Sequence, residues 1–267
     1  MTYDDAKLLV TGSFITFALL EMGAGRFLFK ELTKRRDAII DVICTTILPV
    51  LVLPLVLWCS VSLAEWALPS TRDQWDDWSW WAMFGTLLVA DDLTQYGWHR
   101  LSHTSWLYPL HRAHHSAPYL SVRVVYRNNL IYYALMPGIW LSGLLIHWGF
   151  LSVYVVYMPI KMLVIIGAHA SVPWDAYLLR WKVTRPLMWL LERLISTPAT
   201  HSAHHGLHAE DGVTHYRGNY GNFLFLWDVL LGTAKITRQR PAMFGIEGLA
   251  PIPWYRELLW PTRERRL

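Results

Sequence analysis

The spacing of its histidines constrains this chain more than any other feature of the sequence. Eight of them fall into three clusters whose members are mostly three or four residues apart: His99 and His103; His111, His114 and His115; and His201, His204 and His205. On a helix, residues three or four apart share one face, so each cluster directs its imidazoles the same way. One metal ion takes about four to six ligands, and eight neutral imidazoles therefore predict a site for two ions.

The composition is typical of a membrane protein. Of the 267 residues, 54% are hydrophobic and 16% are charged, whereas a soluble domain carries about 25% charged residues. The formal net charge of +4 is too small to indicate nucleic-acid binding. The two cysteines, Cys44 and Cys59, form no C-x-x-C motif, which excludes a thiolate metal site. The acidic start of the chain lacks the basic region expected of a cleavable signal peptide.

Apolar segments predict an all-α integral membrane protein with about four to five transmembrane helices. A helix of about 20 apolar residues crosses the hydrocarbon core, and such segments occupy residues 8–29, 39–68, 80 to the first cluster, 130–147 and 150–168. Pro49 and Pro54 predict a kink in the second segment, and residues 147–149 a turn between the last two. We expect residues 1–90 to form N-terminal transmembrane helices. Residues 91–267 are expected to form a catalytic region with a membrane hairpin at about 130–168 and a C-terminal cap.

The distribution of charge predicts which side of the membrane the histidines face. Basic loops face the cytoplasm, so Lys30–Arg36 is expected inside and the acidic loop Asp73–Asp77 outside. Along the predicted spans, all three clusters and the C-terminal region then fall inside, whereas His147 falls on the far side. The sequence thus predicts a cytosolic helical cap that holds a histidine-rich dimetal site.

A shell made only of imidazoles indicates the kind of metal. Imidazole suits iron, zinc and copper, but a structural zinc site would be closed by about four ligands. Eight or more ligands beside a membrane favour a dinuclear iron centre that activates dioxygen. Asp92 and Tyr96 precede His99 on the same helical face, and Asp92 is a candidate acceptor for the second ring N–H of a ligand histidine. Alternatively, Asp92 simply lies at the membrane interface and has no role at the metal site.

The ordered motifs resemble those of the fatty acid hydroxylase superfamily. They are D-x-x-x-Y-x-x-H-R-x-x-H from Asp92, L-H-R-A-H-H-S from Leu110, H-S-A-H-H from His201 and N-Y-G-N-F-L-F-L-W-D-V-L-L-G-T from Asn219. That superfamily includes sterol desaturases and sphingolipid and fatty acid hydroxylases, and the similarity covers residues 80–235. It implies an integral membrane enzyme that uses dioxygen and two electrons on a lipid, with two iron ions held by histidines in a cytosolic helical cap.

The resemblance adds candidate residues outside the three clusters. His169 matches the position of a further ligand, so nine ligands are predicted: His99, His103, His111, His114, His115, His169, His201, His204 and His205. His208 is a candidate tenth ligand, with an exposed loop position as the alternative, and His215 lies in the same insert. Asp228 joins Asp92 and Tyr96 as a candidate for a hydrogen bond to a ligand imidazole.

Several functions stay open at this point. The leading hypothesis is a lipid hydroxylase or monooxygenase, and a lipid desaturase would share its metal site. A haem-binding cytochrome or a metal transporter would instead need histidines or charges within the spans. The substrate, fatty acyl, sterol or related lipid, cannot be read from the sequence, and neither can the oligomeric state. We expect iron and dioxygen as cofactor and cosubstrate, with zinc acceptable in purified protein. The electron donor is expected to be a separate cytochrome b5-like or ferredoxin-like protein that docks on the basic end of the chain.

Overall fold

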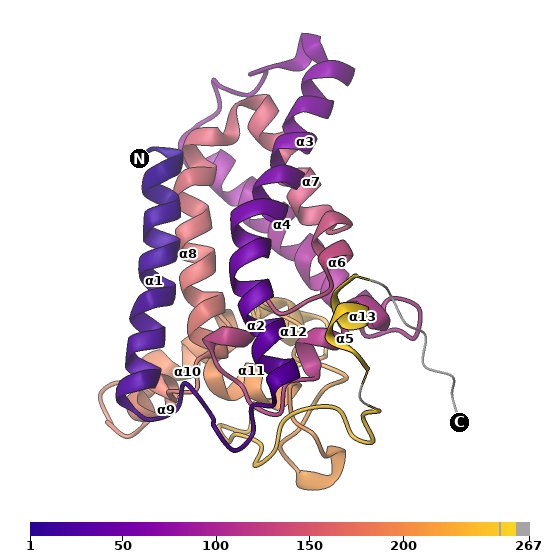
Figure 1. Ribbon diagram of the computed structural model, residues 1–267. Coiled ribbons are helices and arrows are strands. Elements are labelled where there is room, and N and C mark those ends of the chain that lie inside the picture. Colours follow the sequence, from indigo (N-terminus) through magenta and orange to yellow (C-terminus); the bar gives the residue numbers. More distant parts are fainter. Residues whose placement is uncertain (251, 260–267) are drawn as a thin grey trace.

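The computed structural model describes residues 1–250 and 252–259, in which the regular secondary structure consists of helices joined by loops (Figure 1). The helices that run along the bundle are α1 (Tyr3–Gly23), α2 (Arg35–Ile47), α3 (Leu53–Ala67), α4 (Trp80–Ser102), α7 (Pro137–Leu145) and α8 (Leu151–His169). The other helices are α5 (Tyr108–His115), α6 (Leu130–Ala134), α9 (Trp174–Leu179), α10 (Arg185–Leu194), α11 (Pro198–His204), α12 (Leu226–Leu230) and α13 (Trp254–Leu259). Single turns of 3-10 or π helix are η1 (Leu48–Val52), η2 (Pro69–Thr71), η3 (Val122–Val124), η4 (Ile146–Phe150) and η5 (Ala209–Asp211). The predicted all-α class is confirmed.

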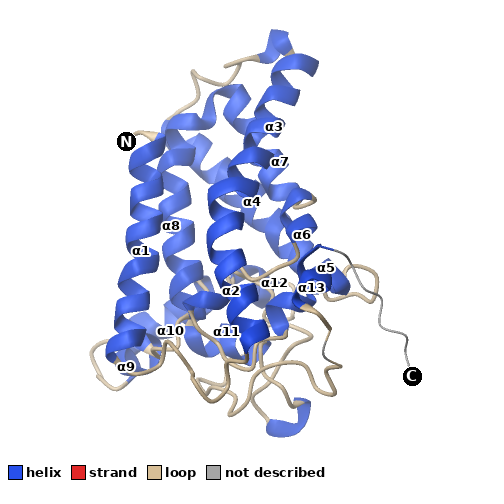
Figure 2. Cartoon of the chain, viewed as in Figure 1, coloured by secondary structure: helices blue, strands red, loops and turns tan. Residues whose placement is uncertain are grey.

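The long helices run side by side as an elongated bundle. α1 packs along α8, α3 packs along α7, and α4 contacts both α7 and α8. Figure 2 shows the short helices and most of the loops gathered at one end of this bundle, where α9, α10 and α11 lie. Segments that are far apart in the sequence therefore meet at that end.

Three stretches of the described residues are long and apolar enough to cross a membrane: Tyr3–Gly23, Arg35–Ala67 and Leu130–His169. They indicate a multi-pass membrane protein. The third stretch is bent, because Gly149 has a φ of 106° and turns the chain between α7 and α8, where the sequence predicts a turn. α4 is not one of the three stretches although it packs within the bundle, so the number of four to five spans stays a prediction.

The prolines of the second apolar segment do not break it. α2 continues into α3 through the π-helical turn η1, and each of these two elements has a proline in its first turn. A proline cannot donate the backbone hydrogen bond of a regular α-helix, and a wider π turn accommodates that loss. The expected kink thus takes the form of a π turn within one helical stretch.

The two ends of the bundle differ in charge. The backbone N–H groups of Asp73 and Trp75 donate to the carbonyls of His147 and Trp148, at 3.0 and 3.2 Å, so the acidic loop lies against the turn between α7 and α8. The basic loop Lys30–Arg36 joins α1 to α2 at the opposite end, where the short helices gather (Figure 1). Relative to one another, the two loops are placed as the charge pattern predicts.

Buried ion pairs hold the segment after the second histidine cluster. The Arg127 guanidinium is fully buried and donates to Asp41 Oδ1 at 2.8 Å and to Asp37 Oδ1 at 2.7 Å. On α1, the buried Glu21 carboxylate accepts from Ser121 Oγ at 2.6 Å. Buried charges persist only when they are paired. The acidic residues of α1 and α2 therefore anchor the polar segment that follows the second histidine cluster.

Candidate metal centre

The nine predicted ligands all lie at the ends of four helices, α4, α5, α8 and α11. Local sequence sets where two of these helices begin. The Thr197 N–H donates to Thr200 Oγ1 at 2.9 Å and the Thr197 hydroxyl accepts from the Thr200 N–H, which is a capping box, and Pro198 follows in the first turn. Pro109 occupies the same place in α5. Each H-x-x-H-H motif thus starts one turn inside a short, well-defined helix.

The structure brings the nine histidines into two adjacent groups. Within each group, one ring nitrogen per residue lies within 4.8 Å of every other. The first group contains His99, His103, His111, His115 and His204, and the second contains His114, His169, His201 and His205. The rings of His115 and His205, one from each group, stack with centroids 4.4 Å apart. Both H-x-x-H-H motifs are therefore divided between the groups, so each group combines imidazoles from α5 and α11.

Hydrogen bonds to carbonyl oxygens define the tautomers of four of these histidines. His99 Nδ1 donates to Tyr220 O at 2.6 Å, and His204 Nδ1 donates to Gly218 O at 2.7 Å. His169 Nδ1 donates to Ile165 O at 2.8 Å, and His111 Nδ1 donates to the Asn128 side-chain oxygen at 2.8 Å. A carbonyl oxygen only accepts, so each Nδ1 carries the proton and each neutral ring keeps a lone pair on Nε2.

Two of these lone pairs face each other across the first group. The Nε2 atoms of His99 and His204 are 3.0 Å apart, yet neither can donate when both Nδ1 atoms carry the protons. A cation between them would remove the repulsion. Two nitrogens bound at about 2.0–2.1 Å to one ion are roughly 2.9–3.4 Å apart in octahedral or tetrahedral geometry. In the second group His201 Nε2 and His169 Nε2 are 2.9 Å apart, and His169 Nε2 and His114 Nε2 are 3.4 Å apart. The donor set and its spacing fit metal ions.

Burial keeps these imidazoles in the form that binds metal. It holds the pKa of His114, His115, His201 and His205 well below the usual value, and the neighbouring imidazoles lower it further. Burial and the approach of His99 act in the same way on the pKa of His204. A histidine must be neutral to bind a metal ion, so the site is prepared for ligation at neutral pH. The Nε2 atom of His103 is buried and has no hydrogen-bond partner among the described residues.

The N-Y-G motif and the glycine before it supply the backbone that orients two of the histidines. Gly218 and Tyr220 give the carbonyls that accept from His204 and His99, and Asn219 between them has a φ of 54°. Asparagine tolerates this left-handed conformation better than most residues. Its side-chain Nδ2 donates to Thr200 O at 2.8 Å and so pins the loop to α11. The motif can be found in the sequence, but the sequence does not show that backbone carbonyls there accept hydrogen bonds from His99 and His204.

The three acidic or phenolic candidates do not hydrogen-bond to a ligand imidazole, which corrects the expectation from spacing. Asp92 Oδ2 accepts from Trp227 Nε1 at 2.9 Å and from the Leu224 N–H at 3.1 Å, and the Tyr96 hydroxyl pairs with Thr233 Oγ1 at 2.9 Å. Asp228 accepts from the N–H groups of Tyr220 and Gly221, at 2.8 and 2.6 Å. Asp228 therefore acts on His99 indirectly, since it holds the backbone whose carbonyl orients that ring.

The remaining histidines lie away from both groups. His208 is 45% exposed in its side chain and pairs with Glu247 at 3.4 Å, so the structure does not bring it to the centre as a tenth ligand. His215 Nε2 donates to Thr233 O at 3.2 Å. His147 lies at the opposite end of the bundle, where its Nε2 donates to Leu68 O at 3.0 Å. These positions separate the nine from the other three histidines of the chain.

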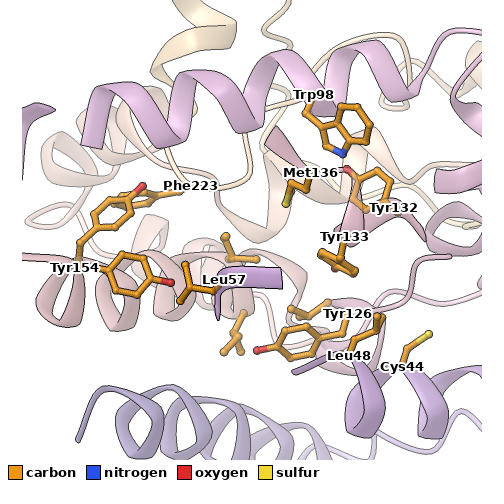
Figure 3. Close-up of a cluster of buried hydrophobic side chains, with 14 of the residues drawn as sticks. Cys44, Leu48, Leu57, Trp98, Tyr126, Tyr132, Tyr133, Met136, Tyr154 and Phe223 are labelled. Carbon is orange, nitrogen blue, oxygen red and sulfur yellow. The ribbon is translucent and has the colours of Figure 1, made fainter. Parts of the chain in front are cut away.

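A cavity of about 580 Å³ extends from the histidine groups between the helices of the bundle. His111, His114 and His169 line one part of it, and residues of α1 line another part, down to Tyr3 near the start of that helix. Figure 3 shows the core around it, where the wall is largely aromatic and aliphatic: Leu57, Tyr126, Tyr132, Tyr133, Met136 and Tyr154. An apolar cavity that reaches the imidazoles is suited to an apolar ligand.

The chain is similar to known proteins over the region that carries the site. A family model described as fatty acid hydroxylase matches residues 84–233, which is more than half of the chain. Alkylglycerol monooxygenase of Danio rerio is 25% identical over 164 residues, which cover 60% of this chain and 31% of that protein. The chain therefore matches about a third of the length of this relative. No solved structure matches the chain.

Proposed function

The chain belongs to the fatty acid hydroxylase family, and we propose that it is a membrane-bound, oxygen-dependent di-iron enzyme that hydroxylates a C–H bond of a lipid. The observation that carries this proposal is the pair of histidine groups with facing Nε2 lone pairs. Without a cation between them, the lone pairs of two neutral imidazoles such as His99 and His204 repel each other at this distance. A bound metal ion would stabilise the arrangement. Nine imidazoles in sets of five and four suit two ions, and an all-imidazole shell accepts iron as well as zinc.

When bound, two iron ions would supply the oxidising power that activates dioxygen toward an unreactive C–H bond. The ligands for one ion would be the first histidine group and those for the other the second group. The chain's own residues prepare the reaction by binding and orientation. Asn128 and the carbonyls of Gly218 and Tyr220 keep the ligand rings in one tautomer, while the apolar cavity wall excludes water from the lipid chain.

Hydroxylation inserts one oxygen atom of dioxygen into the C–H bond and releases the other as water. This balance requires two electrons and two protons besides the lipid and dioxygen. We infer that a separate cytochrome b5-like or ferredoxin-like protein delivers the electrons from the cytoplasm, because the histidine groups share an end of the bundle with the basic loop Lys30–Arg36. The basic residues at the very end of the chain, expected to help docking, lie within 260–267, outside the described residues.

The same proposal covers the organisation of the chain. Residues 1–90 would form N-terminal membrane helices, and residues 91–267 the catalytic region with its cytosolic cap. Helices of both parts contribute to the cavity wall, since Phe14 and Leu57 line it together with His111 and His169. The N-terminal helices would therefore complete the substrate site besides anchoring the enzyme.

A comparison of membrane lipids tests the function. Lipid extracts from cells that express the protein should contain, by mass spectrometry, a lipid that has gained one oxygen atom. Cells expressing His204→Ala should lack it, and cells expressing His147→Ala should contain it, because only the first residue belongs to a histidine group. A lipid that has lost two hydrogen atoms instead would indicate desaturation, and unchanged lipids together with fewer than two metal ions per chain would refute the proposal.

A further inference from the structure

Large apolar side chains are exposed at the end of the bundle that carries the histidine groups. They lie on α9, on α10 and on the loop between these helices, and we call them the α9–α10 surface. Each is between 36% and 91% exposed. They are Tyr177, Leu178, Trp181, Val183, Leu187, Trp189 and Leu190. Contiguous exposed apolar surfaces mark places where a protein contacts a membrane or a partner.

α10 is turned the opposite way from a helix that borders water. Its buried side holds Met188 and the Glu192 carboxylate, which are 1% and 3% exposed. Its outer side holds Leu187 and Leu190, which are three residues apart and therefore share one face. A helix beside water normally buries its apolar face and exposes its charges. The outer side of α10 therefore suits an apolar environment.

The start of α9 is fixed at the ends of two helices that belong to the apolar stretches, α1 and α8. Residues 170–173 alone separate α8 from α9. Within this linker the Ser171 N–H donates at 2.7 Å to Glu21 Oε1, in the last turn of α1. Figure 1 shows α9 and α10 at the end of the bundle where α1 and α8 stop. The α9–α10 surface thus lies at the level where these two stretches would leave the membrane.

The exposed charges among these apolar side chains are all basic. Residues 177–190 contain Arg180, Lys182 and Arg185, which are exposed, and they contain no acidic residue. Helices that lie in the interface of a membrane combine Lys and Arg with Trp and Leu in this way, and anionic lipids attract their basic residues. The charge of the α9–α10 surface therefore complements that of an anionic membrane.

An open pocket beside this surface provides a place for a phosphate group. Arg180, Arg185 and Arg238 line it. The buried Glu192 carboxylate nearby is already paired, because Arg238 donates to it at 2.6 Å and Arg193 at 2.8 Å. Guanidinium groups bind phosphate oxygens through paired hydrogen bonds. The pocket therefore suits the phosphate of a phospholipid headgroup.

We propose that the α9–α10 surface lies in the membrane interface, with its apolar side chains in the leaflet and its basic side chains against the headgroups of anionic phospholipids. An acidic protein would match the charges, but the leaflet next to the start of α9 matches the apolar side chains as well. The contact is tied to the histidine groups, because the Asp175 carboxylate of α9 accepts from the Ala199 N–H of α11 at 2.7 Å. It would hold α11, which carries His201 and His204, at a fixed height above the leaflet.

A fluorescent probe at position 183 tests the contact with lipid. Val183→Cys, at a position that is 91% exposed, is combined with Cys59→Ser in the full chain and labelled with bimane, whereas Cys44 is buried and stays unlabelled. The purified, metal-containing protein is placed in phosphatidylcholine nanodiscs that contain a lipid with a doxyl quencher close to its headgroup. The lipid should quench the probe at position 183. It should not quench the same probe at Glu210→Cys, which is exposed on the turn η5 farther from the spans (Figure 1).

The role of charge is tested by attaching the doxyl group to phosphatidylserine instead of phosphatidylcholine. The serine lipid should quench at least about twofold more strongly, since one basic residue near an anionic surface contributes a factor of about five. The neutralised variant combines Arg180→Gln, Lys182→Gln and Arg185→Gln, and it should respond equally to both lipids. Its matched control removes the same charge from the basic loop at the same end of the bundle and should keep the preference. This control combines Lys30→Gln, Lys34→Gln and Arg35→Gln, at three exposed positions.

Each part of the proposal has its own contrary result. A probe at position 183 that neither doxyl lipid quenches would overturn the membrane contact. Equal quenching by the two lipids in the protein with all its basic residues would overturn the role of anionic headgroups. A preference that persists in the neutralised variant would overturn the role of its three basic residues. Lipid oxidation is not measured, so the outcome is independent of the proposed function.

Discussion

Replacing Asn128 with leucine should loosen the metal ions without removing a ligand. Asn128 is buried, and its side-chain oxygen accepts the Nδ1 proton of His111 at 2.8 Å. Leucine has no acceptor, so the His111 N–H would be left unpaired, at a cost of about 1 to 3 kcal/mol. This range corresponds to roughly 5- to 150-fold in an equilibrium constant. Partners of this kind typically change metal affinity by about 10- to 100-fold, and we expect an effect of that size for Asn128→Leu.

The assay is transfer of metal from the purified protein to a soluble chelator, followed by elemental analysis of the protein. Two variants serve as controls. Asn128→Asp keeps an acceptor for His111 and should hold metal as well as the unchanged protein does. Tyr133→Phe removes the hydroxyl that accepts from Asn128 Nδ2 at 3.2 Å but leaves the bond to His111 intact, so it should also retain metal.

The pattern across these variants decides whether the reasoning holds. If Asn128→Leu keeps its metal against the chelator as firmly as the unchanged protein does, Asn128 does not orient His111 in a metal site. If Tyr133→Phe loses metal to the same extent as Asn128→Leu, general loosening of the core explains the loss, and the specific hydrogen bond does not.

Four further changes probe other parts of the structure. Each of the nine clustered histidines, replaced singly by alanine, should lower both metal content and activity, and two or more variants that keep both near normal would contradict a shared centre. Gly218→Ala should release metal, because a Cβ there would lie 2.4 Å from Thr233 O and displace the carbonyl that orients a ligand, as elemental analysis would reveal. Arg127→Met should destabilise the fold by about 3 kcal/mol in a denaturant titration, since it removes the fully buried cation that bridges the Asp37 and Asp41 carboxylates and leaves them only Arg36 and Arg123 as ion-pair partners among the described residues. Arg72→Met, in an exposed pair, should change the stability by less than about 1 kcal/mol. Reporter fusions at Lys34 and Gln74 should report opposite sides of the membrane, with Lys34 in the cytoplasm, and a shared side would refute the proposed orientation.

The sequence alone was sufficient for features that depend on local spacing. Eight of the nine histidines stand out because neighbours at three or four residues share a helical face, and this holds in any helix regardless of what surrounds it. His169 was added only by the resemblance of the motifs to a known family. The apolar segments, the turn near residue 149 and the opposite charges of the two ends follow from equally local patterns. The family could also be named from the motifs, whose order along the chain does not depend on the fold.

Only the tertiary structure decided which imidazoles belong together and what orients them. The H-x-x-H-H motifs divide between two groups because imidazoles from α5 and α11 lie against one another, as His115 and His205 do, and no spacing within one motif reveals that division. The partners of His99 and His204 are backbone carbonyls, which every residue has, so the sequence cannot mark them. Asp92 looked like the natural partner from its position on α4, but the fold directs its carboxylate to Trp227 instead. Local spacing decides which residues share one face of a helix. The groups that this face contacts depend on how segments far apart in the chain pack together.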